Sequence, residues 1–99
     1  MKILQVDFTY SGPWGEEMSQ AMKDLALSIS EEEGLIWKIW TEDQEAGTAG
    51  GIYLFADGAT AKAYLDMHSA RLEQGGCTAI RGKIFDINTP LSKLNRAPI

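Results

Sequence analysis

The sequence predicts an α+β fold of the ferredoxin-like kind, in which a four-stranded antiparallel sheet carries two helices on one face. Three observations support this fold. Four short segments either alternate between apolar and polar residues or are apolar throughout, and both patterns are typical of β-strands. Two longer segments between them repeat apolar residues at helical spacing. The resulting order, βαββαβ, closes most simply as a split βαβ sheet.

The first two elements lie in the N-terminal third of the chain. Residues Ile3–Tyr10 alternate, with Leu4 and Val6 on one face and polar side chains on the other, which indicates a strand. Pro13 suits the first position of a helix, because its fixed φ angle fits there and its missing N–H is not needed. A single helix is expected from this proline to Gly34, with an apolar stripe formed by Met18, Met22, Leu25 and Ile29.

The middle of the chain predicts two strands joined by a hairpin. Residues Leu35–Glu42 form the first, with Leu35, Trp37 and Ile39 expected on one face and Ile36, Lys38 and Trp40 on the other. Residues 43–47 are a polar loop that contains a glycine. The next strand, Gly50–Ala56, starts with two glycines, which indicates a bulge or a close approach of backbones.

The last third predicts a helix, a strand and a tail. Asp57 is a suitable N-cap for a helix that runs to about Gln74. Its inward stripe is formed by Ala61, Tyr64, Leu65, His68 and Leu72. A fourth strand follows over Thr78–Ile87. Residues 89–99 form a short C-terminal tail, whose small apolar side could reach over a partner or leave the tail loose.

Three of the strands are apolar, or mixed, on both faces, although two helices can cover only one face of the sheet. A large uncovered apolar face marks an interface. We therefore expect a twofold homodimer in which the sheets of two copies meet. Asp7 lies on the face assigned to this interface, so it should pair with Lys38, Arg81 or Lys83.

Composition limits the classes of function. A chain of 99 residues is expected to form one domain, residues 1–99. Nine basic residues against fourteen acidic ones give a net charge of −5, which argues against nucleic acid or an anionic membrane surface as a partner. No apolar stretch is long enough to span a membrane and no leader is evident, so a cytoplasmic location is expected. The single cysteine, Cys77, excludes an internal disulfide, and no metal motif is present.

Two polar side chains on the predicted second helix stand out. His68 is the only histidine and lies on the inward face, where it is either a general base or a structural histidine bonded to its surroundings. Arg71 follows one turn later and shares that face with Tyr64. Arg71 could hold a substrate oxygen or stabilise an oxyanion, or it could pair with a sheet carboxylate such as Asp86.

Aromatic residues offer flat surfaces for an aromatic ligand, although aromatics on strands more often belong to a core or an interface. Trp37 and Trp40 differ by three positions, so they should point to opposite faces of the sheet and only one should line a given pocket. The candidate substrate-binding residues are Trp14, Trp37, Trp40, Tyr53, Phe55 and Tyr64.

Five blocks of the sequence, in order, carry a resemblance to a known family: FTYSGPWG, GLIWKIWTE, AGGIYLF, AYLDMHSARL and KIFDINTPLSKLN. Together they resemble the YdhR-type monooxygenases of the dimeric α+β-barrel superfamily over nearly the whole chain. The resemblance implies a ferredoxin-like protomer that pairs sheet to sheet. It also implies, by analogy, oxygenation of a quinol or phenol without a cofactor.

Two functions of different kinds follow. The first is a cofactor-independent monooxygenase that oxygenates a small aromatic, phenolic or quinol-like substrate with O2, with His68 as the candidate base and Arg71 at a substrate oxygen. The alternative is a homodimeric small-molecule-binding or stress-associated protein on the same fold, without catalysis. A haem-degrading protein with His68 as an iron ligand is a remote third option.

Overall fold

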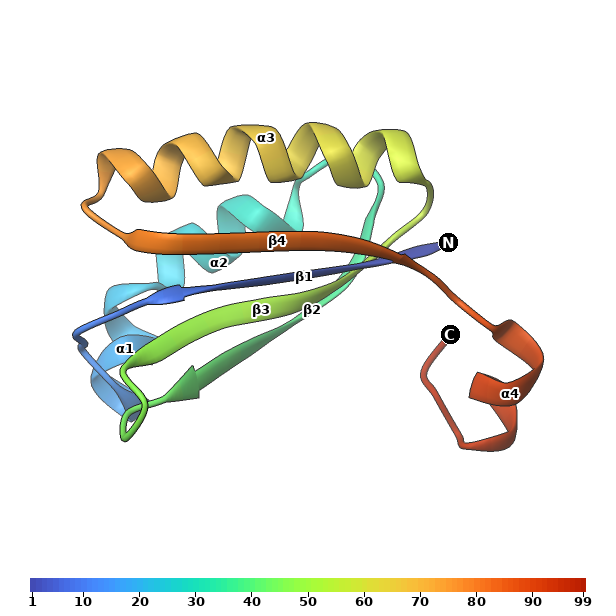
Figure 1. Cartoon of the computed structure of the whole chain (residues 1–99), viewed down its shortest axis with the longest axis horizontal. Helices are drawn as coiled ribbons and strands as arrows, with labels where there is room; N and C mark the ends of the chain where they lie inside the picture. Colours follow the sequence, from blue (N-terminus) through green and yellow to red (C-terminus); the bar gives the residue numbers. More distant parts are fainter.

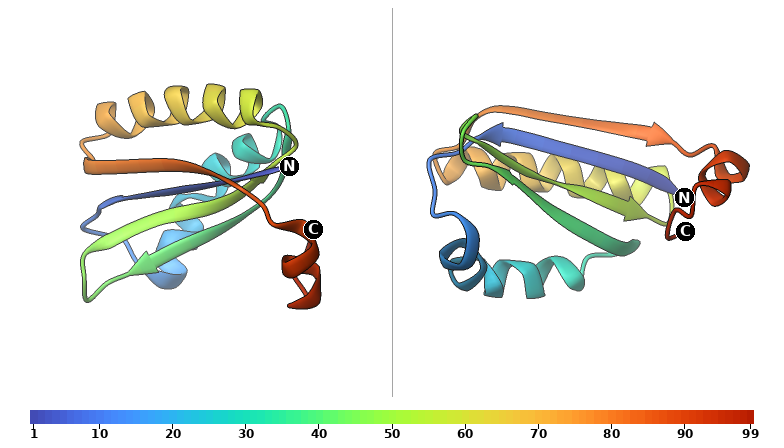
Figure 2. Two further views of the ribbon diagram at one scale, coloured as in Figure 1. Left: turned by 45° about the vertical axis from the view of Figure 1, so that its right-hand side comes forward. Right: turned by 90° about the horizontal axis from the view of Figure 1, so that it is seen from below.

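The computed structural model describes all residues, 1–99, and places three helices on one face of a four-stranded antiparallel sheet (Figures 1 and 2). The elements follow one another along the chain in the order β1 (Lys2–Thr9), α1 (Gly15–Ala21), α2 (Lys23–Ser30), β2 (Leu35–Asp43), β3 (Thr48–Phe55), α3 (Gly58–Gln74), β4 (Thr78–Asp86) and α4 (Thr89–Leu94). None of these helices has the length and apolar character needed to cross a membrane.

The strands are ordered β2-β3-β1-β4 in the sheet, so β1 lies between strands that come much later in the sequence. Leu4 of β1 pairs with Tyr53 of β3 on one side and with Ile84 of β4 on the other, and all neighbouring strands are antiparallel. The predicted ferredoxin-like arrangement is therefore confirmed.

The core lies between the sheet and the helices. Because side chains alternate along a strand, Leu4 and Val6 of β1 fall on the helix-facing side, where they are almost completely buried. They meet Ile29 of α2 and the inward side chains of α3, and the whole cluster comprises Leu4, Val6, Ile29, Tyr53, Phe55, Ala61 and Tyr64. The same packing fixes the position of α3 over β1 and β4, and thus of the side chains that this helix points at the sheet (Figure 1).

The predicted single first helix is wrong, because two helices meet at Met22, whose φ and ψ angles of −100° and 6° bend the chain. The N–H of Gly15 donates to a carboxylate oxygen of Glu42 at 2.8 Å, which ties the start of α1 to the end of β2. The bend keeps Met18 of α1 and Ile29 of α2 both buried against the sheet. Pro13 lies before the N-cap residue Trp14, so its predicted position as first helical residue is also wrong.

The predicted faces of β2 need one correction. A register shift between Leu35 and Trp37 makes Ile36 the extra residue of a β-bulge. Leu35 consequently pairs with Phe55 and packs on the core, on the same side of the sheet as Lys38 and Trp40. An alternating pattern does not predict this change, because the extra residue of a bulge moves the residues that precede it in the strand to the opposite face from the one expected.

The helix α3 and its ends agree with the prediction. The carboxylate of Asp57 accepts a hydrogen bond from the Thr60 N–H at 2.8 Å and so caps the helix. Ala61, Tyr64 and His68 are buried on its inward face. The hairpin after β2 is also confirmed, although β3 begins at Thr48, two residues earlier than expected.

No helix covers the other face of the sheet (Figure 2). Ile39 remains 53% exposed there. Near one edge, the Trp37 indole N–H donates to the Pro98 carbonyl oxygen at 2.9 Å, which draws the end of the tail back to the sheet. Asp7 pairs with Arg81 at 2.8 Å, one of its three predicted partners, whereas Lys38 lies on the helix-facing side.

Candidate functional site

A cavity of about 70 Å³ lies between the helix-facing side of the sheet and the helices α1, α2 and α3. Strands β1, β2 and β3 supply its floor, and the bend between α1 and α2 lies above it together with α3. Its lining is mostly apolar and aromatic, and it comprises Phe8, Tyr10, Met18, Met22, Leu25, Lys38, Trp40, Gly50, Tyr53, His68, Leu72 and Cys77. The basic side chains in this wall are Lys38 and His68.

His68 is 3% exposed and is held by Arg71 from the next turn of α3. The guanidinium contacts the imidazole Nδ1 through Nη2 at 2.8 Å and through Nε at 3.3 Å. Because arginine only donates, Nδ1 must be the acceptor and the ring proton must reside on Nε2. Burial, together with the nearby charges of Arg71 and Lys38, lowers the pKa of His68 to about 4. His68 is therefore a neutral imidazole near pH 7.

Two tyrosines extend this arrangement into the core. The Tyr64 hydroxyl donates to the Tyr53 hydroxyl oxygen at 3.1 Å. The Tyr64 ring also stacks on the His68 ring, with centroids 5.0 Å apart and planes inclined by 25°. Burial raises the pKa of both phenols, so both remain protonated at neutral pH. These contacts fix the rotation of the His68 ring.

Lys38 approaches the cavity from β2, and its ammonium group lies over two aromatic rings. Its Nζ lies 3.5 Å from the centroid of the Trp40 ring and 4.7 Å from that of Tyr53, which is the range of a cation–π interaction. Burial, and then repulsion by Arg71, lower the pKa of Lys38 to about 7. An amine with this pKa exchanges its proton close to neutral pH.

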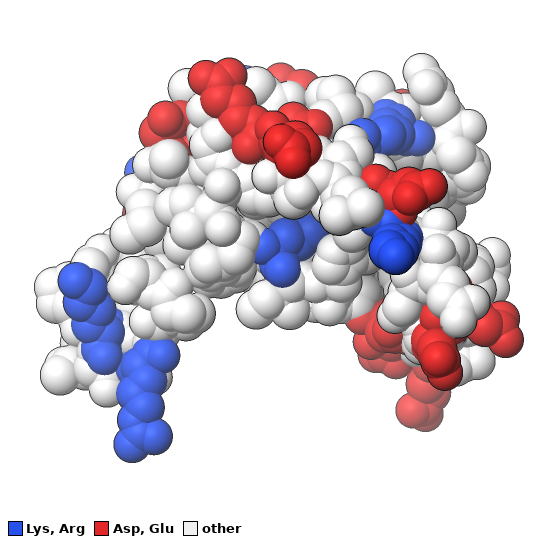
Figure 3. All heavy atoms as spheres, turned by 180° about the vertical axis from the view of Figure 1, so that it is seen from behind, with Lys and Arg blue, Asp and Glu red and all other residues white.

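The charge inside the site is opposite to that of the protein. The chain carries a net charge of −5, and acidic side chains gather at the top and at the lower right of the face shown in Figure 3. No aspartate or glutamate lines the cavity, whereas Lys38 lies in its wall and Arg71 lies directly behind His68. Such a site favours an anion, or a group that becomes an anion when it binds.

Two flexible methionine side chains lie between the cavity and a groove on the surface. A groove of about 330 Å³ lies between α1, α2 and the edge strand β2, and it shares Met18, Met22 and Trp40 with the cavity. A cavity that admits benzene has a volume of about 150 Å³, so the enclosed space alone is too small for an aromatic ring. Methionine side chains repack easily, and their displacement would join the two spaces.

The structure brings together some of the predicted site residues. His68, Trp40 and Tyr53 line the cavity. Arg71 and Tyr64 contact His68 from behind. The alternative role for Arg71, an ion pair with Asp86, is wrong, since Asp86 pairs with Lys2.

Three predicted aromatic residues lie elsewhere. Trp14 packs edge-on against Tyr10, with ring centroids 5.0 Å apart, at the start of α1. Trp37 lies on the uncovered face of the sheet, opposite to Trp40 as its spacing predicts. Phe55 is completely buried in the core. None of these three lines the cavity.

Sequence reasoning missed Lys38, Tyr10 and Cys77 as wall residues of the cavity. The sequence held an indication for Lys38, which is a single cation within the apolar segment LIWKIW and alternates with Trp40. No comparable indication existed for Tyr10 or Cys77. Tyr10 follows β1 and Cys77 precedes β4, and only the pairing of these two strands brings both residues to the cavity.

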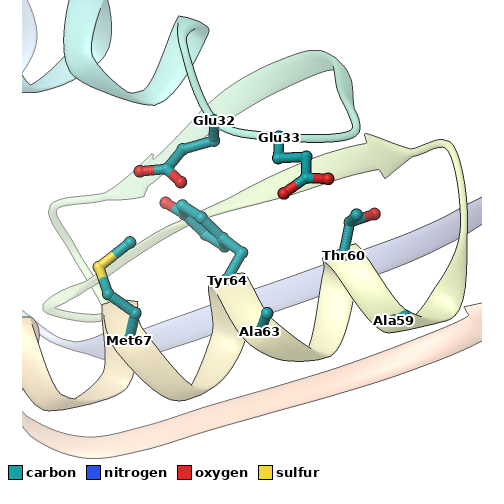
Figure 4. A pocket seen from close by; sticks show the side chains of 7 residues that line it. All are labelled: Glu32, Glu33, Ala59, Thr60, Ala63, Tyr64 and Met67. Atoms are coloured by element: carbon teal, nitrogen blue, oxygen red, sulfur yellow. The ribbon is translucent and has the colours of Figure 1, made fainter.

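A second cleft, of about 370 Å³, lies between α3 and the segment that follows α2 (Figure 4). Glu32 and Glu33 point across it toward Tyr64 and Thr60 of α3. Its two carboxylates and open form make it unsuited to a phenolate or to water-free chemistry. No group of three or more histidine, cysteine, aspartate or glutamate side chains lies close enough together to hold a metal ion.

The lowered pKa of His68 predicts a pH dependence of stability. The unfolded chain takes up a proton at this residue near pH 6.5, whereas the folded protein does so only near pH 4. The unfolded state thus binds more protons in this range, and the free energy of unfolding should fall as the pH drops from about 6.5 to 4, by up to about 1.4 kcal/mol per unit. Urea unfolding of the parent and of His68→Gln, which accepts from Arg71 without titrating, should diverge below about pH 6.5. An equal loss in both proteins would contradict this assignment.

Comparison with known proteins identifies the family. The family described as "Putative mono-oxygenase ydhR" matches residues 3–98, which is almost the whole chain. The chain belongs to the ydhR family. No curated protein matches it.

The fold of this ydhR-family chain is similar to that of a solved structure from Deinococcus radiodurans, described as a putative antibiotic biosynthesis monooxygenase. The TM-score is 0.60 at 13% sequence identity, over 89% of this chain and 93% of the other. At this identity the likeness concerns the fold. Within this fold, the cavity beside His68 is the candidate functional site of this ydhR-family chain.

Proposed function

We propose that this ydhR-family chain is a cofactor-independent monooxygenase that oxygenates a small aromatic, phenolic or quinol-like substrate with O2. The observation that carries the proposal is the cavity itself. Aromatic walls, formed by Trp40 and Tyr53, surround a space whose polar groups are cationic or neutral and never acidic. Once Met18 and Met22 are displaced, such a space accepts an aromatic ring and stabilises the negative charge that develops on its oxygen.

The chemistry requires little besides this environment. A phenol that loses its proton becomes an electron-rich phenolate, which passes one electron to O2 and yields a phenoxyl radical and superoxide. These two combine through a new C–O bond to give a hydroperoxide, after protonation, and loss of water from it leaves a quinone. One phenol and one O2 thus give one quinone and one water, and the substrate supplies all the electrons.

Two side chains of the cavity are candidates for the acceptor of the phenolic proton. His68 is the base expected from the sequence, and Lys38 is the other basic group in the wall. Arg71 would stabilise the oxyanion through its charge and through the His68 ring, whose Nε2–H remains free to donate because Nδ1 accepts from the guanidinium.

The proposal predicts oxygen consumption by the purified protein. With a small quinol or phenol and no added flavin, haem or metal, and with a chelator present, an oxygen electrode should record one O2 consumed per quinone formed. With ¹⁸O2 and a monophenol, one labelled atom should enter the product and one the water. Uptake that equals the rate without protein, at saturating substrate, would contradict catalysis.

The alternative is a small-molecule-binding or stress-associated protein without catalysis, which would use the same cavity. Both functions require Met18 and Met22 to move, because the enclosed volume of about 70 Å³ is smaller than an aromatic ring requires. If the protein binds a phenol, seen as quenching of tryptophan fluorescence, and the oxygen electrode records no uptake, the binding function replaces the enzymatic one.

We also propose that the uncovered sheet face pairs with a second copy of the chain. Supporting this, Ile39 and Phe85 are 53% and 40% exposed there, and large apolar side chains exposed on an uncovered sheet face favour an interface. A cytoplasmic location remains a prediction from the sequence. Sedimentation that finds only well-folded monomers at micromolar concentration would contradict the homodimer.

A further inference from the structure

Lys38 reaches the cavity along a path that the sheet leaves open for it. It lies on β2 opposite Tyr53 of β3, on the helix-facing side. The neighbouring Gly51 has no side chain, and a Cβ placed there would lie only 2.6 Å from Lys38 Cε. The lysine stem therefore occupies the space that a side chain at position 51 would fill, and the ammonium group comes to lie over Trp40 at the cavity wall.

The charged and titratable groups around Lys38 include no anion. From α3 it faces Arg71 and His68, and from β3 it faces Tyr53, whose phenol stays protonated. The remaining titratable groups of the cavity wall are Tyr10 and Cys77, and burial raises the pKa of both, so both are neutral near pH 7. No hydrogen bond or ion pair holds the Lys38 Nζ, in contrast to Lys2 and Lys62, which pair with aspartates.

A purely structural role explains this arrangement poorly. Lys38 is half-buried, and even partial burial of an uncompensated ammonium beside a guanidinium costs free energy, which the contact with Trp40 offsets only by about 0.5–2 kcal/mol. A methionine would pack over Gly51 and against Trp40 without that cost. A lysine at this position is explained if the ligand supplies the negative charge that pairs with its ammonium group.

We infer that Lys38 accepts the phenolic proton of the ligand, so that the cavity binds a phenol as its anion beside the newly formed ammonium group. The inference rests on the proposed function for the class of ligand. In this step the phenol O–H bond breaks, a new N–H bond forms on the neutral Lys38 amine, and the resulting phenolate–ammonium pair carries no net charge. No electron leaves the phenol until O2 reacts.

The geometry separates this role from that of His68. The Nδ1 lone pair of His68 is directed at Arg71, and Nε2 already bears the ring proton, so the imidazole enters the reaction as a hydrogen-bond donor. Its pKa of about 4 also makes it a weak acceptor at neutral pH, whereas that of Lys38, about 7, matches a general base at that pH. His68 and Arg71 then position and stabilise the oxygen from which Lys38 removes the proton.

The test uses a phenol whose anion absorbs at longer wavelength than tryptophan, 4-hydroxyacetophenone, at a pH above the pKa of Lys38 and below that of the free phenol. The parent protein should show the phenolate band on binding and release no proton to a weakly buffered solution. Lys38→Met should reduce the band at saturating ligand at least about tenfold, because the bound phenolate loses the ammonium group that would stabilise it. Lys38→Arg keeps a permanent charge, so it should show the band with about one proton released per phenol bound.

Controls keep the result independent of folding and of turnover. Near-ultraviolet circular dichroism confirms that the variants fold. Lys62→Met removes an exposed lysine that pairs with Asp66 and does not line the cavity, so it should retain the full phenolate band. A full band in Lys38→Met, release of about one proton by the parent, or failure of the parent to bind the phenol would each overturn the inference. A band without oxygen uptake would instead retain the inference about Lys38 and remove the monooxygenase.

Discussion

Replacement of Arg71 by methionine is expected to lower kcat for oxygen uptake by about 100- to 1000-fold, because His68 would no longer be held as a donor to the oxyanion, and loss of one such donor in a water-poor site costs about this much. Methionine retains much of the apolar stem of Arg71 but removes the charge and both contacts to His68 Nδ1. The imidazole then loses the neighbour that fixes its tautomer. Initial rates of oxygen uptake at saturating quinol measure the effect.

An exposed lysine of the same helix provides the control. Lys62 of α3 pairs with Asp66 at 3.1 Å and does not line the cavity. Lys62→Met also removes one positive charge, so kcat should change less than about twofold, in keeping with the small contribution of an exposed ion pair. If the two variants lose activity equally, Arg71 acts through net charge or stability and not through His68 at the reacting oxygen.

Gly50→Ala is expected to prevent folding. A Cβ at this position would overlap the Val6 carbonyl oxygen of the neighbouring strand and lie 2.8 Å from Asp7 Cα, and both obstacles are backbone atoms of the central strand β1. Strain of this kind costs more than about 4 kcal/mol, which is a large part of the total stability of a small domain. Near-ultraviolet circular dichroism and the urea midpoint should show loss of the folded state at room temperature.

Gly58→Ala is the control for this substitution. Gly58 begins α3, and a Cβ there would come no closer than 3.8 Å to a neighbouring atom, the Cε of Lys2. Its urea midpoint should therefore stay close to that of the parent, within the roughly 0.5 kcal/mol typical of surface changes. A folded Gly50→Ala protein of near-parental stability would show that β1 and β3 can separate without cost.

Local pattern was sufficient to predict most of the fold. Two-residue alternation in Ile3–Tyr10 and the cap at Asp57 are properties of neighbouring residues, so they can be recognised without knowledge of the packing. The faces of β2 were predicted correctly from Trp37 onward and wrongly before it. The bulge at Ile36 depends on how β2 pairs with β3, and the bend at Met22 depends on how α1 and α2 pack on the sheet. No residue pattern near either position predicts it.

The sequence by itself determined that His68, Arg71 and Tyr64 share one side of a helix, because helical spacing alone sets that relation. The tertiary structure decided that Lys38, from a strand thirty residues earlier, meets this helix at a cavity without carboxylates. It also decided that Trp40 and Tyr53 form walls of that cavity, while Trp14, Trp37 and Phe55 do not. The physical reason is that spacing along a chain specifies only the face of the helix or strand on which a side chain lies. The residues that it contacts in space depend on the order of the strands in the sheet and on positions such as Gly51, where the missing side chain leaves space for Lys38.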